Sequence, residues 1–138
     1  MMNMKLQVGV KIALINPEGK ILLLKRSDKY GWDLVGGRMN PGKNLSENLK
    51  REIKEETGLV WNGVSKLVSA QDIIMPDQHV VRLTFIGHIK GVTKIKKNEE
   101  SLEFKWFTIS ELKKLINKGL DRFVAELITN KVIQPELK

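Results

Sequence analysis

The sequence predicts an α/β (α+β) fold, in which a mixed β-sheet is flanked by helices within a single domain spanning residues 1–138. The order of patterns is the first observation behind this prediction: apolar β-branched runs, one amphipathic helix, further strands, and then helices. Size is the second, because 138 residues, of which 41% are hydrophobic, suffice to bury one core without disulfides. No internal repeat, linker or low-complexity segment divides the chain.

The N-terminal part of the chain predicts strands. Residues 8–15 form a β-branched and apolar run, the following NPEGK stretch is a turn signal, and residues 21–24 resume the run. This pattern is typical of a β-hairpin. Residues 32–35 predict a short extended piece, which we expect the two glycines that follow to halt.

An amphipathic helix is predicted next, beginning after the proline and glycine at positions 41 and 42. Leu45, Leu49 and Ile53 recur every four residues and form one apolar stripe. Gly58 stands where a left-handed C-terminal cap is expected, so the pattern predicts a helix over residues 45–57.

The C-terminal half predicts three strands and two helices. The strands are expected at residues 64–74, 79–91 and 103–107. Ser110 is the expected N-cap of the first helix, which has a buried stripe of Leu112, Leu115 and Ile116 and stops at Gly119. The last helix is expected at residues 121–131.

Composition excludes some classes of site and leaves others open. The chain has no cysteine, which excludes disulfides and thiolate zinc sites, and the formal charge is +8. That charge attracts polyanions such as nucleotides, nucleic acid or an acidic membrane surface, or it simply supports solubility. We expect a cytoplasmic location, since no signal peptide and no apolar run of about 20 residues is present.

Three carboxylates gather on the predicted helix at residues 45–57. At about 100° per residue, Glu52, Glu55 and Glu56 occupy one flank beside the apolar stripe. Like charges at these spacings destabilise a helix, and a hard divalent cation removes the conflict. Because neither histidine nor cysteine is near, Mg²⁺ or Mn²⁺ fits better than zinc. The alternative is a solvated face, in which Arg51 pairs with Glu55 and with the glutamate four residues before it.

The surrounding stretch resembles the Nudix box, whose pattern begins with Gly37 in this sequence. Its second half is complete, with Arg51, Glu52, Ile53, Glu55, Glu56, Gly58 and Leu59 in place. The flanking WDLVGGR and FKWFTISEL are similar to the family's as well, so the likeness covers nearly the whole chain. The resemblance implies a Nudix-type α/β/α sandwich that hydrolyses a nucleoside diphosphate linked to another moiety X, with Mg²⁺ assisting the attack of water.

The resemblance also implies roles for the acidic residues and the arginine beside them. Glu52, Glu55 and Glu56 would be metal ligands, and Glu52 is alternatively the catalytic base. Arg51 would orient Glu55. A further acid from a later loop often assists in this family, and Glu100 is expected, with Glu99 next; an ordinary solvated loop is the alternative.

Substrate contacts are expected around the box. Gly36, Gly37 and Gly42 would let the backbone approach phosphate closely. Lys25, Arg26 and Arg38 are candidates for phosphate oxygens, or else solvated cations. Trp32 and Tyr30 are candidates for stacking on a base, although Trp32 fits a core position equally well. Lys43 departs from the pattern, which has a glutamate there; it would meet phosphate directly or mark a weakened copy, and Asn40 replaces another frequent acid.

Two other functions stay open at this point. A catalytically silent nucleotide-binding or regulatory module on the same scaffold is the alternative, and RNA binding or RNA-end processing comes third. No aromatic-rich platform for single strands is visible, so a nucleic-acid partner is not favoured. A homodimer is possible because similar proteins are often dimers. The sequence does not select a substrate among nucleotides.

Overall fold

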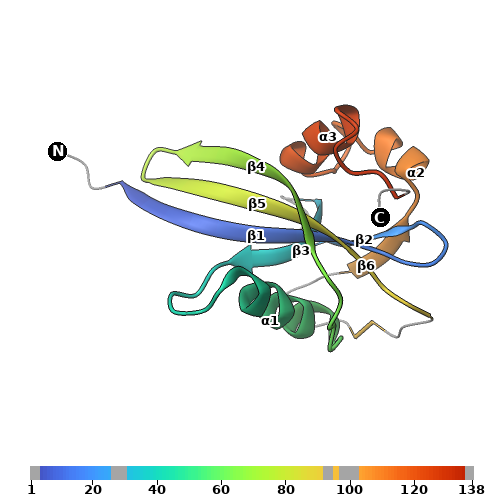
Figure 1. The fold of residues 1–138 in the computed structure, drawn as a ribbon. Coiled ribbons are helices and arrows are strands. Elements are labelled where there is room, and N and C mark those ends of the chain that lie inside the picture. Colours follow the sequence, from blue (N-terminus) through green and yellow to red (C-terminus); the bar gives the residue numbers. More distant parts are fainter. Residues whose placement is uncertain (1–3, 26–30, 92–94, 97–102, 136–138) are drawn as a thin grey trace.

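The computed structural model describes residues 4–25, 31–91, 95–96 and 103–135. The elements are β1 Lys5–Ile15, β2 Ile21–Lys25, β3 Trp32–Arg38, α1 Leu45–Thr57, β4 Lys66–Met75, β5 Gln78–His88, β6 Glu103–Phe107, α2 Ile109–Lys114 and α3 Arg122–Thr129. The strands form a mixed six-stranded sheet in the order β4-β5-β1-β3-β2-β6. Helix α1 covers one face, and α2 with α3 covers the other (Figure 1). This confirms the predicted mixed sheet flanked by helices.

Strand β1 is central because it pairs on both sides. It runs parallel to β5 along its whole length, from Lys5↔Gln78 to Ile15↔His88, and antiparallel to β3. The expected hairpin therefore exists only at its turn, where β1 meets β2 through the pair Ile15↔Ile21. Beyond that pair, β2 lies against β3 and β6 instead.

Strand β3 does not halt at the glycine pair, contrary to the sequence-based expectation. Gly36 and Gly37 pair with Lys11 and Val10 of β1, and β3 continues to Arg38. A Cβ atom at Gly36, where φ is 148°, would lie 2.0 Å from the Val10 carbonyl oxygen. Glycine therefore lets the two strands approach here instead of ending the strand.

Successive side chains of β1 point to opposite faces of the sheet, so this strand contributes residues to both hydrophobic cores. Ile12 and Leu14 are fully buried in the core that also contains Leu49 and Ile53 of α1. The neighbouring residues of β1 face the opposite core, which contains Leu112 of α2 and the apolar residues of α3. Each fully buried aliphatic side chain contributes roughly 1.5–3 kcal/mol relative to exposure, so α1 is anchored mainly through this stripe.

Helix α1 has the bounds that the sequence predicts. The Asn44 side chain accepts a hydrogen bond from the Glu47 amide, and the Glu47 side chain accepts one from the Asn44 amide in return, which forms a capping box. Gly58 takes the left-handed conformation, with φ 77°, and its N–H donates to the Lys54 carbonyl. Both ends are thus fixed by local residues.

The predicted start of α2 was wrong. Thr108, not Ser110, is the N-cap, because Glu111 three residues later completes a capping box with it. The helix ends at Lys114, so only Leu112 of the expected stripe is fully buried, while Leu115 and Ile116 pack against the core from turns. Within the described residues, no helix has the length and apolar character that crossing a bilayer requires.

Candidate functional site

A row of buried polar side chains runs along α1 at a spacing of four residues. Asn48, Glu52 and Glu56 retain only 0%, 8% and 3% of their exposure, beside the apolar stripe of Leu49 and Ile53. Residues four apart lie on the same side of a helix, so the row faces the end of β3 and the loop that follows it. Burying two carboxylates in this way is costly unless partners compensate them.

The glycine pair of β3 receives both carboxylates. The Gly36 amide donates a hydrogen bond of 2.7 Å to Oε1 of Glu56. A Cβ atom on Gly37 would lie only 2.8 Å from Oε1 of Glu52, so any larger residue would push that carboxylate away. Helix and strand can approach this closely because neither glycine has a side chain.

Arg51 ties the buried row to the strand. One guanidinium nitrogen, Nη1, lies 2.8 Å from Oε1 of Glu52 and 3.5 Å from Oε2 of Glu55. The other, Nη2, donates to the Asn48 side chain at 2.9 Å and to the Arg38 carbonyl at 3.1 Å. The arginine thereby holds the Glu52 carboxylate, the same group that Gly37 contacts.

Glu55 does not join the other two carboxylates. Its side chain retains 58% of its exposure, whereas those of Glu52 and Glu56 turn toward β3. At about 100° per residue, Glu52 and Glu56 are about 40° apart around the helix, and Glu55 lies further round toward solvent. In the part of the chain that the structure describes, no three His, Cys, Asp or Glu residues are placed to hold a metal ion together. Among the described residues, the two buried carboxylates are therefore the candidate ligands for a cation.

Asn48 organises the loop between β3 and α1, a role the sequence analysis missed. Its Oδ1 accepts from the Asn40 amide at 2.8 Å, and its Nδ2 donates to the Lys43 carbonyl at 3.0 Å and to the Asn44 carbonyl at 2.9 Å. The sequence contained a signal for this role, since Asn48 precedes Glu52 by four residues and therefore lies on the same side of the helix. Lys43 is held at the surface of this loop by its backbone.

A surface hollow of about 440 Å³ lies beside this loop and contains two of the predicted substrate contacts. Arg38 and Lys43 both line it, and both side chains are exposed. Arg38 donates to the Gln7 side chain and, at 3.2 Å, to that of Gln78. The hollow therefore carries two cations, one at the end of β3 and one in the loop before α1.

A second hollow, of about 400 Å³, opens on the other side of the same glycines and was not anticipated. Its walls are Gly9, Lys11, Asp33, Gly36, Gly37, Arg38, Ile73, Val80, Arg82 and Asp121. We call it the sheet-face pocket. Lys11 and Arg82 are charged residues inside otherwise apolar strands, which is the one sequence feature that pointed to it.

The other predicted contacts are placed less favourably. Trp32 packs its ring edge-on against Phe107 with centroids 5.0 Å apart, which is the core position that the sequence left open. Lys25 pairs with Trp32, the first residue of β3. At ~3.3 Å per strand residue, Trp32 lies about 16 Å along the strand from Gly37, so Lys25 is far from the carboxylates. Four further candidates, Arg26, Tyr30, Glu99 and Glu100, lie outside the described residues.

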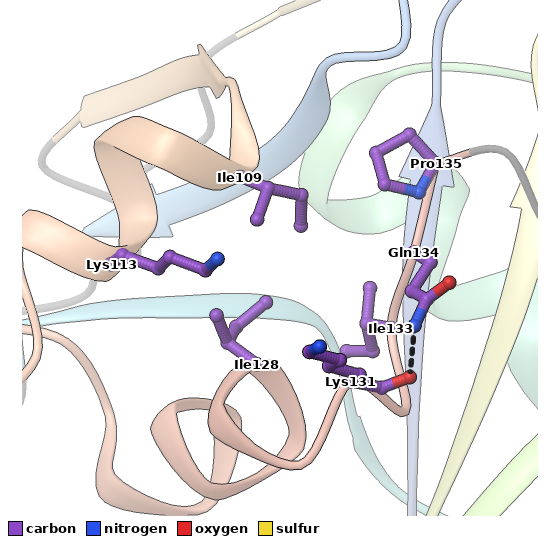
Figure 2. A pocket seen from close by; sticks show the side chains of 7 residues that line it. All are labelled: Ile109, Lys113, Ile128, Lys131, Ile133, Gln134 and Pro135. Carbon is purple, nitrogen blue, oxygen red and sulfur yellow. Dashed lines mark hydrogen bonds between the residues drawn. The ribbon is translucent and has the colours of Figure 1, made fainter.

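A third hollow, of about 430 Å³, lies between α2, α3 and the segment after α3 (Figure 2). Three isoleucines form its apolar wall, and the chains of Lys113 and Lys131 border it. It is on the α2–α3 side of the sheet, away from α1 (Figure 1), and carries no carboxylate. The chemistry of the carboxylate row therefore does not involve it.

Comparisons with known proteins show what this chain is similar to. The model of the NUDIX domain matches residues 5–127. A Bacillus subtilis protein named "Putative 8-oxo-dGTP diphosphatase" is 34% identical over 75% of this chain and 68% of its own length. A Methanocaldococcus jannaschii protein named "ADP-ribose pyrophosphatase" is 35% identical over 74% of this chain and 62% of its own length. The solved MutT protein from Methanosarcina mazei Go1 matches 94% of this chain and 95% of its own, with TM-score 0.82 and 24% identity, a likeness of fold.

Proposed function

The chain belongs to the NUDIX domain family, and from this premise we propose that it is a Mg²⁺-dependent hydrolase of nucleotides. The linkage cleaved is the diphosphate of a nucleoside diphosphate joined to another moiety X. The observation that carries the proposal is the pair of buried carboxylates, Glu52 and Glu56, seated on the glycine pair of β3.

The chemistry of this donor set fits Mg²⁺. This ion commonly binds one or two carboxylates, keeps several waters and completes its shell with substrate phosphates, so it does not need a protein cage of three acids. Two carboxylates at 8% and 3% exposure are costly to bury, and a divalent cation bound between them would offset that cost. Mn²⁺ accepts the same oxygen ligands. Glu100, expected as a further ligand, stays a prediction.

The residues around the carboxylates then divide the remaining work. Bound Mg²⁺ would neutralise phosphate charge and make the attacking water more acidic. Arg51 holds Glu52 in place, and the Gly36 amide does the same for Glu56, so the carboxylates need little reorganisation during the reaction. Glu52 and Glu55 both contact Arg51, and either would serve as the base that takes the proton from water.

The phosphates of the substrate would enter past Arg38 and Lys43. Both cations border the hollow beside the loop that precedes α1, and diphosphate chemistry needs positioning and charge neutralisation more than covalent help. Lys43 replaces an acid with a base at the mouth of the site, which strengthens phosphate attraction there while removing one possible support for metal. The two relatives named above point to nucleotides such as 8-oxo-dGTP and ADP-ribose as candidate substrates.

The test is a panel of nucleotides assayed with Mg²⁺ for released phosphate and pyrophosphate, followed by Glu56→Gln on the substrate that is cleaved. Because the glutamine amide oxygen can still accept from Gly36, the fold should survive while the charge is lost. Turnover should fall at least about a hundredfold, as expected for lost charge stabilisation. Glu126→Gln, the same change at an exposed position of α3, is the matched control and should leave turnover unchanged. Unchanged turnover in Glu56→Gln would reject the proposal.

A catalytically silent nucleotide-binding module is the second candidate, and the exposed Lys43 at a position where the box has a glutamate favours it. The same panel separates the two. Nucleotides that raise the melting temperature without any phosphate, pyrophosphate or mononucleotide being released would support the silent module. Release of product from any member supports the enzyme.

A further inference from the structure

The sheet-face pocket contains a network of four charged side chains that balance one another. Lys11 lies 3.1 Å from Oδ2 of Asp33, and Arg82 lies 2.7 Å from Oδ1 of the same carboxylate. Arg82 also lies 3.3 Å from Oδ1 of Asp121. The two cations and two carboxylates of this network balance one another, so the network itself does not favour phosphate; Arg38, which also lines the pocket, adds one positive charge.

Arg82 joins three separate parts of the fold at this point. It comes from the middle of β5, Asp33 from β3, and Asp121 from the N-cap of α3, where its Oδ1 accepts from the amides of Phe123 and Val124 at 3.0 Å. The guanidinium retains only 6% of its exposure. Its orientation toward the two acids leaves its own buried Nε without a hydrogen-bond partner.

A second buried polar atom without a partner lies on the neighbouring strand β4. Gln71, the residue of β4 paired with Arg82, also has a buried side-chain oxygen without a partner. Arginine Nε and glutamine Oε1 are a donor and an acceptor, yet neither satisfies the other. Leaving a buried polar atom unpaired is costly, so the bonds of Arg82 to Asp33 and Asp121 must outweigh that cost.

One oxygen of the network is left to meet a ligand. Oδ1 of Asp121 is already shared between the helix amides and Arg82, whereas Oδ2 makes no hydrogen bond or ion pair within the described part of the chain. The side chain of Asp121 retains 21% of its exposure and borders the pocket. Its pKa is raised by burial and by the nearby Asp33, and Arg82, Lys11 and the Val124 amide oppose that rise. Arg82 therefore helps to keep Asp121 an acceptor.

Resting on the function proposed above, we propose that Arg82 is a positioning residue, which holds Asp33 and Asp121 so that the pocket accepts an uncharged, hydrogen-bond-donating end of the substrate. Gly36 and Gly37 separate this pocket from the buried carboxylates by the thickness of a single strand. A nucleotide can thus place its phosphates by the carboxylate row and its base or sugar against Asp121. Buried acceptors reject groups that leave them unpaired, so this end of the site selects the substrate.

The test compares binding of three probes in the presence of Mg²⁺: GTP, 5-phosphoribosyl diphosphate and tripolyphosphate. GTP carries both a base and a sugar, 5-phosphoribosyl diphosphate carries a sugar only, and tripolyphosphate carries neither. In Arg82→Met, affinity for GTP should fall about tenfold, equivalent to about 1.4 kcal/mol, while affinity for tripolyphosphate is unchanged. Arg82→Lys should recover part of the loss. If affinity for 5-phosphoribosyl diphosphate falls as well, the pocket binds the sugar; if it is unchanged, the pocket binds the base.

Arg122→Met is the matched control. Arg122 also lies over the Phe123 ring, 4.8 Å from its centroid against 5.9 Å for Arg82, but it makes no ion pair with Asp33 or Asp121 among the described contacts. Binding of all three probes should be unaltered. If the Met variant of Arg82 does not fold, Asp121→Asn replaces it, because asparagine keeps the N-cap and removes only the charge.

A second readout needs no substrate, so it separates failure of this inference from failure of the proposed function. Titration of the carboxyl of Asp121 by NMR should show a higher pKa in Arg82→Met than in the wild type. For a hydrolase, Arg82→Met should also raise KM more than it lowers kcat. An unshifted carboxyl, or an equal loss of affinity for GTP and tripolyphosphate, would overturn the role of Arg82 whatever the chain hydrolyses.

Discussion

Adding one methyl group to Gly37 perturbs the proposed metal site without removing any of its ligands. In Gly37→Ala the new Cβ would lie 2.8 Å from Oε1 of Glu52, while ordinary contacts begin at 3.4 Å, so the carboxylate must retreat by about 0.6 Å. Because a misplacement of about 1 Å at a reacting centre can cost about a hundredfold, we expect kcat to fall about tenfold. The Mg²⁺ concentration for half-maximal activity should rise as well.

The fold should tolerate this substitution. The colliding atoms belong to the end of a flexible side chain, and Gly37 does not adopt a left-handed conformation, so the free energy of unfolding should change by less than about 1 kcal/mol. Gly9→Ala on the adjoining strand controls for stability, since its nearest neighbours are 3.6 Å away. Steady-state kinetics across Mg²⁺ concentrations measure kcat and the Mg²⁺ dependence, and urea denaturation measures the free energy of unfolding. Wild-type kcat and Mg²⁺ dependence in Gly37→Ala would refute the reasoning that the glycine keeps Glu52 in place.

Three further predictions concern stability. Asn48→Ala should lower the free energy of unfolding by about 1–3 kcal/mol in urea, because the Asn40 amide and two loop carbonyls lose a buried partner; a wild-type midpoint would contradict this. The pKa of Glu111 is lowered, chiefly by its hydrogen bonds with Thr108, so its contribution to stability is present above pH 4.5 and is lost on acidification. Between neutral pH and about pH 3.5, the free energy of unfolding should therefore fall less in Glu111→Gln than in the wild type. The pKa of Asp121 is raised, so the wild type should lose stability as pH rises above 3.8, and Asp121→Asn should lack that decline; equal pH profiles would contradict it.

Helix α1 could be predicted to the residue because its determinants are local. The four-residue apolar repeat places its buried face, and the asparagine and glycine at its ends supply the caps. The start of α2 was missed although its determinant was equally local, since Thr108 and Glu111 form the capping box that Ser110 lacks. Helix geometry placed Glu52 and Glu56 on one side of α1, because the spacing of four is a property of any helix, but it grouped with them Glu55, whose side chain is exposed.

The rest of the site depends on contacts that no local pattern contains. The glycine pair was read as a stop signal, but the strand continues because β1 approaches it closely, and strand order is not written in the spacing of residues. The sheet-face pocket joins residues of β1, β3 and β5 with the N-cap of α3, which are far apart in the sequence. Lys11 and Arg82 could be noticed as charges inside apolar strands, but their partners could be identified only once the register was known.

The most direct measurement of the central claim follows the side-chain carboxyl resonances of the glutamates during titration with Mg²⁺ in the presence of a non-hydrolysable nucleotide. If Glu52 and Glu56 hold the ion against the substrate's phosphates, their two resonances shift together and saturate, whereas that of Glu126 on α3 does not move. Resonances of Glu52 and Glu56 that stay unshifted while the nucleotide binds would contradict the claim.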